Sequence, residues 1–301
     1  MRTLILGCGY VGLQAGRVLV RQGHEVYGVR RSDAAQAELQ AAGIRPLLAD
    51  LTKPGGLDHL PGPFDWVVNT AASTQGGAED YRRVYLNGTR NVISWLSRMV
   101  PRKYVYTSST GVYGQTDGSL VDETALTGPS TETGRVLVET ERLLVAATCE
   151  TGFPAVVLRV AGIYGPGRGY WLKQFLQGEA RISGTGERIL NMIHRDDVAG
   201  CIAAALAAGR AGEAYNAADD EPVTQIDCFR WLAQRLGREL PPASDEPETI
   251  ERRRALTNKR VSNRKLKAEL SYQFKYPTFR EGYEVELASL QQAGLMKPSA
   301  R

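Results

Sequence analysis

Three glycines near the N-terminus have the spacing of a dinucleotide-binding turn. In GCGYVG, residues 7–12, they follow the GxGxxG pattern. The first glycine permits a tight turn, the second lets the backbone approach a pyrophosphate, and the third lets a helix pack closely on its strand. The phosphates would then lie at the positive end of that helix. The predicted contacts are Gly7, Cys8, Gly9, Tyr10, Val11 and Gly12.

The end of the second expected strand bears on which dinucleotide binds. Proteins that prefer NAD usually place Asp or Glu there, and this carboxylate binds the adenosine ribose. Here HEVYGVRRS ends in Arg30, Arg31 and Ser32. Guanidinium groups pair well with the 2′-phosphate of NADP; the alternative is that both arginines are surface residues that follow a strand. The sequence favours NADP over NAD, and it places Asp50 and Leu51 near the adenine.

The elements that must position these residues alternate between strand and helix. An apolar strand precedes the glycines and a helix follows them, which is the context that makes the pattern specific. Strands are expected at 2–6, 24–29, 44–50, 64–72, 103–109 and 154–160, and helices at about 11–23, from 33, at 80–99 and at 133–148. This alternation predicts an α/β doubly wound parallel sheet, the Rossmann fold.

The regular alternation ends after Tyr164. GPGRGYW (165–171) and ISGTGER (182–188) are expected to be loops, and two or three further helices follow. We predict an NADP-binding Rossmann domain at residues 1–165 and mainly a smaller substrate lobe at 166–301. Segments at about 190–216 are expected to return to the Rossmann domain.

Composition excludes several classes of protein. The chain has 301 residues, of which 43% are hydrophobic and 23% charged, as in an ordinary soluble protein. No apolar run approaches the roughly 20 residues that cross a bilayer, and the N-terminus does not read as a signal peptide, so a cytoplasmic location without membrane contact is expected. The four cysteines are scattered, which predicts neither a disulfide framework nor a metal site.

A net charge of +4 is too small to predict a nucleic-acid partner, although one stretch is locally basic. This stretch is either a solvated surface or a patch that attracts an anionic substrate, for example one that carries phosphates. Aromatic residues do not interleave with it, as a groove for single strands would require. Its members are Arg252, Arg253, Arg254, Lys259, Arg260, Arg264, Lys265 and Lys267.

Six further segments occur in a recognisable order along nearly the whole chain. They are NTAAS (69–73), NGTRN (87–91), YTSSTGVYG (106–114), LRVAGIYGPG (158–167), IHRDDVA (193–199) and YNAADDEPVT (215–224). Together with the glycine turn they resemble the extended short-chain dehydrogenase/reductase superfamily, of the NAD(P)-dependent epimerase/dehydratase type. The resemblance implies a small-molecule substrate and often a homodimer formed through the helices at 80–99 and 133–148.

The resemblance also implies roles for individual residues. Thr70, Ala71, Ala72 and Thr107 would line the cofactor at the ends of their strands. Ser109 would hydrogen-bond the reacting oxygen of the substrate, the alternative being a serine at a strand end that caps a turn.

The resemblance fails where relatives carry their catalytic pair. They have Tyr-x-x-x-Lys on the next helix, and a glutamate four residues after the lysine. Alignment through Glu139 puts Arg135 at the lysine position and Thr131 at the tyrosine position, and none of the 13 tyrosines has a lysine four residues later. A threonine hydroxyl is far too weak an acid to replace the tyrosine. Arg135 could still supply positive charge to the cofactor ribose.

Two interpretations therefore stay open. In the first, the chain is an NADP-dependent oxidoreductase, epimerase or dehydratase whose substrate is a small polar carbonyl or hydroxyl compound or a sugar nucleotide. Its proton donor would be relocated, with Tyr85 and Tyr164 as the main candidates and Tyr113 and His194 as others. In the second, it is a non-catalytic NADP-binding redox sensor or partner-binding module, because fold alone does not confer chemistry. An open polar pocket near Ser109 would favour the enzyme.

Overall fold

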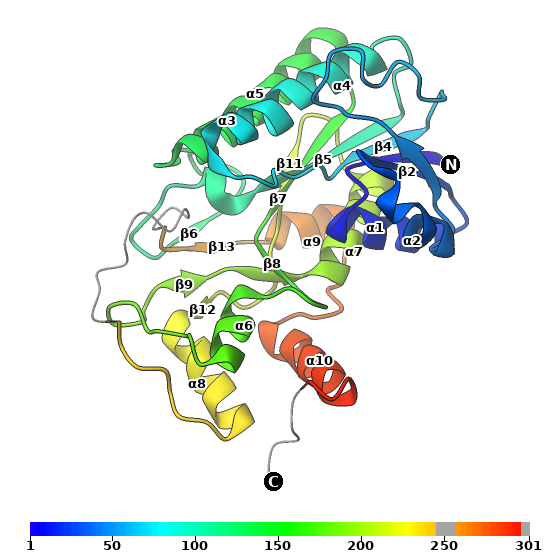
Figure 1. Cartoon of the computed structure of the whole chain (residues 1–301). Helices are drawn as coiled ribbons and strands as arrows, with labels where there is room; N and C mark the ends of the chain where they lie inside the picture. Colours follow the sequence, from blue (N-terminus) through cyan, green and yellow to red (C-terminus); the bar gives the residue numbers. More distant parts are fainter. Residues whose placement is uncertain (245–256, 296–301) are drawn as a thin grey trace.

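Seven parallel strands form the central sheet of the computed structural model, which describes residues 1–244 and 257–295 (Figure 1). Their order is β11-β7-β5-β4-β1-β2-β3, and every neighbouring pair runs parallel. The Rossmann architecture predicted from the alternation is therefore confirmed. The strands are β1 (Arg2–Leu6), β2 (Glu25–Arg30), β3 (Arg45–Leu48), β4 (Trp66–Asn69), β5 (Lys103–Ser109), β7 (Ala155–Val160) and β11 (Ala214–Ala217).

Helices cover both faces of this sheet (Figure 1). Central strands such as β7, AVVLRV, are buried along their whole length, because a parallel sheet packs against helices on each side. One face carries α1 (Tyr10–Arg21), α2 (Gln36–Ala41), α7 (Arg195–Ala208) and α9 (Arg264–Leu270). The other carries α3 (Gly77–Tyr81), η2 (Arg82–Asn87), α4 (Gly88–Leu96) and α5 (Glu132–Thr151).

The helix expected at 80–99 is a continuous run over 77–96 with a π-helical middle part, η2. A π-helical turn inserts one residue into the helical ladder, and such turns often occur at functional sites. Tyr85 lies inside η2. The two short turns η1 (Asp33–Ala35) and η3 (Thr110–Val112) follow β2 and β5.

A smaller lobe with its own apolar core lies below the sheet (Figure 1). Within it β8 (Gly162–Tyr164) pairs with β10 (Met192–His194), and β9 (Ile189–Leu190) pairs with β12 (Val223–Thr224). Its helices are α6 (Tyr170–Gln177), α8 (Gln225–Leu236) and α10 (Phe279–Gln292). The pair β6 (Ser119–Val121) and β13 (Lys259–Val261) lies between this lobe and the sheet domain.

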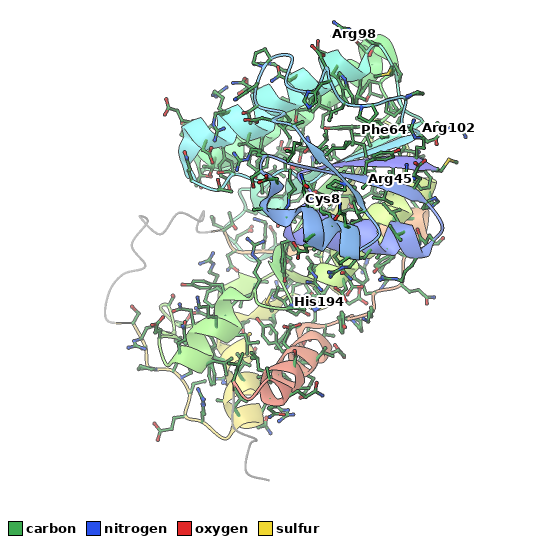
Figure 2. All side chains as sticks on the ribbon, turned by 45° about the vertical axis from the view of Figure 1, so that its right-hand side comes forward. Cys8, Arg45, Phe64, Arg98, Arg102 and His194 are labelled. Carbon is green, nitrogen blue, oxygen red and sulfur yellow. The ribbon has the colours of Figure 1, made fainter. Side chains whose placement is uncertain are left out.

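The chain passes between the two parts more than once. After β10 it returns to the sheet domain as α7, which packs against α1, and then as the edge strand β11. Figure 2 shows His194, the residue before α7, at the junction of the two parts.

In the part of the chain that the structure describes, no helix has the length and apolar character needed to span a membrane. The described residues also contain no cluster of three or more His, Cys, Asp or Glu side chains that could hold a metal ion. The four cysteines are free; Cys8, Cys201 and Cys228 are buried, whereas Cys149 is exposed on α5.

Candidate cofactor and catalytic site

The glycine turn lies between β1 and α1, against the end of β4. Gly7 has φ = 77°, in the left-handed region, and a Cβ at this position would overlap the backbone of Ala71. At Gly12 a Cβ would lie 2.6 Å from Thr70 Oγ1. The Thr70 hydroxyl donates to the Gly7 carbonyl at 3.0 Å. The turn therefore leaves no room for side chains where its backbone meets β4.

The first turn of α1 is open to an anion. Within residues 1–244 and 257–295 no side chain caps the helix, and its first turn contains no acidic residue, so its N–H groups are available to a ligand. The guanidinium groups of Arg168 and Arg195 lie 4.9 and 5.2 Å from the ring centre of Tyr10. The Tyr10 hydroxyl is buried without a hydrogen-bond partner in the described part of the chain. Arg195 is paired with Asp196 at 2.9 Å, so Arg168 and the N–H groups of α1 supply the positive charge that fits a pyrophosphate.

Arg30 lies over the same turn. Its Nη1 is 3.3 Å from the place that a Cβ of Gly9 would occupy. Its other terminal nitrogen is 3.6 Å from Glu38 Oε2, and its Nε is buried without a partner among residues 1–244 and 257–295. Arg31 and Ser32 follow it on the exposed surface. A guanidinium thus faces the position where the adenosine half of a dinucleotide would be expected.

The loops that follow β3 and β4 lie at the same end of the sheet as the glycine turn, where the parallel strands have their carboxyl ends. Asp50 accepts hydrogen bonds from the backbone and hydroxyl of Thr52, which outweigh burial and lower the pKa of Asp50. The Leu51 carbonyl accepts a hydrogen bond from Asn91 at 2.9 Å. The Thr107 hydroxyl donates to the carbonyl of Asn69 at 3.1 Å, and so joins the ends of β5 and β4. Ala71 and Ala72 extend from β4 beside them.

Ser109 is the last residue of β5. Its Oγ accepts a hydrogen bond of 3.0 Å from the Gly111 amide and thereby caps η3. The capping role that was the alternative to catalysis is therefore real. Because the oxygen only accepts in this contact, the hydroxyl hydrogen can still be donated to a substrate. Capping and substrate binding are compatible here.

Thr131 and Arg135 make local contacts at the start of α5. Thr131 caps α5, its Oγ1 accepting from the Gly134 amide at 3.1 Å. The Arg135 side chain is 52% exposed and pairs with Glu132 at 2.9 Å. Glu139 forms an ion pair of 2.9 Å with Arg82 on the outer surface. The alignment through Glu139 therefore does not hold, because it places both catalytic positions away from the sheet.

Glu141 is the glutamate of α5 that faces the sheet. It accepts a hydrogen bond from Ser108 at 2.6 Å and pairs with Arg159 on β7 at 2.8 Å. Four and eight residues before Glu141, on the same helical face, lie Leu137 and Thr133. Leu137 is buried in the core and can move no proton. The sequence itself indicates which glutamate faces the sheet, because Glu141 has the spacing of the apolar residues of α5 and Glu139 does not.

Three of the other candidate donors are buried and hydrogen-bonded to other protein groups. Tyr164 is 2% exposed within the core of the smaller lobe, its hydroxyl donating to the Thr278 carbonyl at 3.4 Å. His194 accepts a hydrogen bond from the Asp196 amide and so caps α7. The Tyr113 hydroxyl donates to Asn216 at 2.8 Å. These contacts are structural, and the burial of Tyr164 in the core of the smaller lobe does not favour it as a proton donor.

Tyr85 is placed differently. Its hydroxyl accepts a hydrogen bond of 3.3 Å from the amide of Ser73, in the loop that follows β4. Its ring packs against both apolar clusters of the sheet domain and lies 4.8 Å from the ring of Tyr81. Burial raises the pKa of Tyr85 to about 12. The Tyr85 hydroxyl and Ser109 therefore lie near the ends of the neighbouring strands β4 and β5, on the cofactor side of the sheet.

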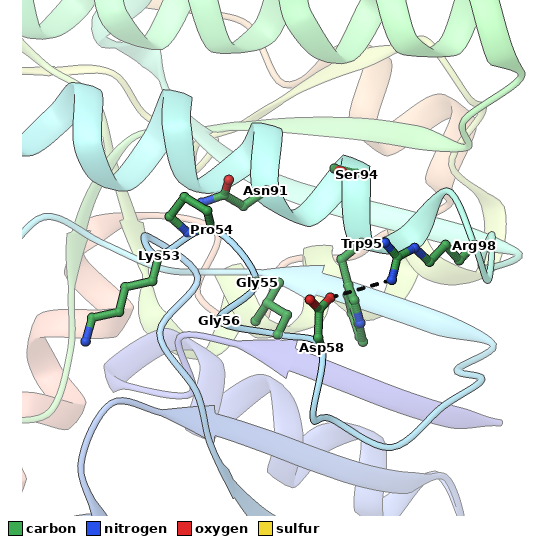
Figure 3. A pocket seen from close by; sticks show the side chains of 10 residues that line it. Lys53, Pro54, Gly55, Gly56, Asp58, Asn91, Ser94, Trp95 and Arg98 are labelled. Atoms are coloured by element: carbon green, nitrogen blue, oxygen red, sulfur yellow. Dashed lines mark ion pairs between the residues drawn. The ribbon is translucent and has the colours of Figure 1, made fainter.

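Two surface hollows lie elsewhere. Figure 3 shows one between the loop at 53–58 and α4, where Asp58 and Arg98 approach to 4.0 Å across its rim. The other is lined by α8 and the start of α10, with Trp231 and Arg280 in its wall. Neither hollow is lined by Ser109, Tyr85 or Tyr164.

The basic stretch is not one surface. Arg252, Arg253 and Arg254 lie outside the described residues. Lys265 pairs with Glu213 at 2.6 Å and Lys267 with Asp220 at 3.0 Å, so their charges are balanced locally. Arg260 and Arg264 are exposed, and Lys259 is buried.

Comparison with known proteins agrees with this geometry. A model of the NAD dependent epimerase/dehydratase family matches residues 3–218. Protein YeeZ of Escherichia coli (strain K12) is 29% identical over 283 residues, which cover 92% of this chain and 96% of that protein. A functionally unknown conserved protein from Silicibacter pomeroyi is 31% identical, with a TM-score of 0.77 and coverage of 96% of this chain and 98% of that one.

A third similarity concerns the fold alone. The dTDP-glucose 4,6-dehydratase DesIV from Streptomyces venezuelae, solved with NAD bound, is 21% identical with a TM-score of 0.84. The match covers 100% of both chains, so the smaller lobe is arranged as in that protein too.

Proposed function

The chain belongs to the NAD dependent epimerase/dehydratase family, and we propose that within it the protein is an NADP-dependent oxidoreductase. The proposed substrate is a small polar carbonyl or hydroxyl compound, with sugar nucleotides as one class. The observation that carries the choice of NADP is the guanidinium of Arg30 over the glycine turn, where an NAD-preferring protein would place a carboxylate.

The residues present fit a dinucleotide. Gly7, Gly9 and Gly12 form a cradle that any Cβ would fill, and the N–H groups of α1 with Arg168 would hold the pyrophosphate. Arg30 and Arg31 would bind the 2′-phosphate. When bound, the nicotinamide supplies or accepts a hydride.

Two side chains at the sheet edge perform the rest of the proposed chemistry. Ser109 donates a hydrogen bond to the reacting oxygen, while its Oγ is held by the Gly111 amide. Tyr85 gives up a proton to the oxygen that gains charge during reduction. Since burial raises the pKa of Tyr85 to about 12, this phenol stays protonated at neutral pH and suits the role of acid rather than base.

Calorimetric titration with NADPH and NADH tests the cofactor choice. The double substitution Arg30→Ala and Arg31→Ala should weaken NADPH binding roughly 10- to 100-fold, because charge-assisted hydrogen bonds contribute about 1.5–3 kcal/mol. Binding of NADH should change less than about twofold. Arg21→Ala, at the other end of α1, is the matched control and should change neither. Equal losses for both dinucleotides would show that the arginines do not recognise the 2′-phosphate.

The inward face of α5 favours a second candidate, a non-catalytic NADP-binding module. Leu137 and Thr133, four and eight residues before Glu141, supply neither an acid nor a base, which a protein freed from catalysis could tolerate. A chain that binds NADPH tightly but reduces no compound in a screen of aldehydes, ketones and sugar nucleotides would support the module over the enzyme.

A further inference from the structure

A buried lysine lies at the junction of the two parts. Lys259, the first residue of β13, is only 4% exposed. Its Nζ donates to the Tyr113 carbonyl at 2.8 Å and to the Thr257 hydroxyl at 2.9 Å. Both acceptors are neutral. An ammonium group has three N–H donors, so these contacts leave one unused.

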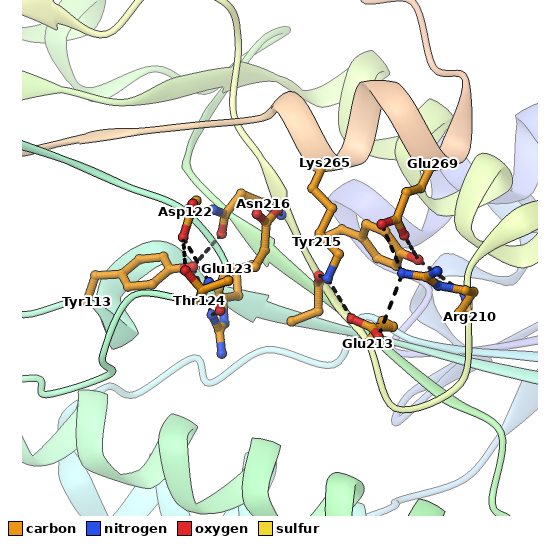
Figure 4. Close-up of polar contacts among 12 residues, drawn as sticks. Tyr113, Asp122, Glu123, Thr124, Arg210, Glu213, Tyr215, Asn216, Lys265 and Glu269 are labelled. Carbon is orange, nitrogen blue, oxygen red and sulfur yellow. Dashed lines mark hydrogen bonds and ion pairs between the residues drawn. The ribbon is translucent and has the colours of Figure 1, made fainter.

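Lys259 lacks the counter-charge that nearby lysines have. In residues 1–244 and 257–295, no carboxylate lies within ion-pair distance of its Nζ. By contrast, Figure 4 shows Lys265 reaching Glu213, and Lys275 pairs with Asp196 at 3.5 Å. A buried cation without a counter-ion is costly and is seldom kept without a reason.

Among the described residues, the nearby charge that acts on Lys259 is that of Arg188. Burial, with the nearby charge of Arg188, lowers the pKa of Lys259 to about 8. The neighbouring strands β6 and β9, SLV and IL, contribute no titratable side chain. Tyr113 offers only its carbonyl, because its hydroxyl is bonded to Asn216 and Arg159. Lysines with perturbed pKa values cluster at functional sites.

The position of Lys259 is fixed from both parts of the molecule. Asn191, between β9 and β10, donates to the Lys259 carbonyl at 2.9 Å and accepts from the Val261 amide at 2.8 Å. On the other side, Tyr113 lies four residues after Ser109, beyond the end of β5. The ammonium is thus held rigidly on the smaller lobe's side of the sheet edge.

We propose that Lys259 anchors the substrate, its remaining N–H binding an anionic group, carboxylate or phosphate, that the substrate carries. This inference rests on the proposed function for the identity of the site, and it narrows the substrate to an anion. It does not make Lys259 a donor in the chemical step. Lys259 is instead a specificity residue, which acts on the end of the substrate away from the reacting oxygen.

Anion binding at this site should change the protonation of Lys259. A bound anion stabilises the charged ammonium, so the pKa of Lys259 should rise when the anion binds. Above about pH 8, where the free ammonium loses its proton, binding must take up a proton and should weaken. Malonate is a suitable probe because it is fully ionised from pH 7 upward, so any pH dependence belongs to the protein.

The test is calorimetric titration of the NADPH-saturated protein with malonate and, at pH 7.5, with inorganic phosphate. NADPH occupies the glycine turn and removes that competing anion site. Malonate affinity should fall at least about tenfold between pH 7 and 9.5, with proton uptake seen as a heat that depends on the buffer. Lys259→Met should abolish this binding, whereas Lys265→Met, which removes a paired lysine nearby, should not. Preference for malonate or phosphate assigns the anion class.

The titrations distinguish a failure of the anion site at Lys259 from a failure of the proposed NADP-dependent function. If NADPH does not bind, the same titrations are run without it, and the difference between the wild type and Lys259→Met still reports on this site. If Lys259→Met does not fold, Lys259→Arg replaces it, and binding should persist without the change near pH 8 because guanidinium does not titrate there. Binding of neither probe, or equal binding by wild type and Lys259→Met, would overturn the inference.

Discussion

At the scale of single residues, the question is which side chain moves the proton. The inward face of α5 holds Leu137 and Thr133, and neither is an effective acid. Tyr85 remains, held by the Ser73 amide within a π-helical turn. The burial of Tyr85 bears on the direction of proton transfer. A phenol with a pKa of about 12 can protonate a developing alkoxide but is rarely ionised as a base.

We expect Tyr85→Phe to lower kcat for reduction at least tenfold, about 1.4 kcal/mol of barrier, with little change in NADPH affinity. Initial rates with a substrate found by screening would measure this. Tyr81→Phe, which alters the adjacent ring, is the control and should retain activity. In the wild type, the reductive rate should show no loss from ionisation of Tyr85 up to about pH 10, since its pKa lies near 12. Full activity of the Tyr85 variant would eliminate it as the donor.

At the scale of elements, the register of α5 on the sheet decides which residues face the cofactor. Glu141 and Glu139 are two residues apart, yet one is bonded to Arg159 inside and the other to Arg82 outside. Helical geometry separates them by more than half a turn. Because Glu141 is buried and Glu139 is exposed, substituting each glutamate in turn tests which residues of α5 face the sheet.

Glu141→Gln should lower the free energy of unfolding by about 3–5 kcal/mol, because it leaves the charge of Arg159 buried and unpaired. Glu139→Gln, the matched control, should cost less than about 1 kcal/mol, as exposed ion pairs do. Urea denaturation of the two variants measures both values. Similar costs for the two would contradict the register described here.

The packing of α1 on β4 gives a second prediction at this scale. Gly12→Ala should destabilise the fold by about 1–3 kcal/mol and weaken NADPH binding, since its Cβ would lie 2.6 Å from Thr70 Oγ1. Gly128→Ala meets no atom within 4 Å and should change stability by less than about 0.5 kcal/mol. Thermal denaturation and a cofactor titration of each variant would measure the two effects. A Gly12 variant with wild-type values for both would show that the turn is looser than described.

At the scale of the whole molecule, the site is formed where the sheet edge meets the smaller lobe. Arg168 comes from the loop after β8 and Arg195 from the start of α7, yet both lie against Tyr10 of the glycine turn. A cofactor held by these groups contacts distant parts of the chain. Its binding should therefore stabilise the molecule as a unit. Dimerisation through α4 and α5 stays a prediction.

NADPH at 100 times its dissociation constant should raise the free energy of unfolding by about 2.7 kcal/mol. NADH at the same concentration should raise it less, because its affinity is expected to be lower. Denaturation curves with each dinucleotide would measure this difference, and the Arg30→Ala, Arg31→Ala variant should abolish it. An identical shift with both dinucleotides in the wild type would argue against a preference for NADP.

The sequence by itself determined the sheet domain and the glycine turn, because both depend on local patterns. The hydrophobic periodicities of strands and helices differ over short windows of sequence, and Gly7, Gly9 and Gly12 all lie within six residues. The absence of Tyr-x-x-x-Lys is equally visible without a structure. The NADP preference stays a prediction from Arg30 and Arg31.

Only the tertiary structure decided which side chains meet. Tyr164 follows a recognisable loop motif, but its ring enters the core of the smaller lobe, and no local pattern reports that direction. The register of α5 depends on the contact of Glu141 with Arg159, 18 residues along the chain. In the sequence, Lys259 is one of several cations in a basic stretch. Its burial depends on the pairing of β13 with β6, which joins segments more than 130 residues apart. Contacts between distant segments follow from packing, which the local sequence does not encode.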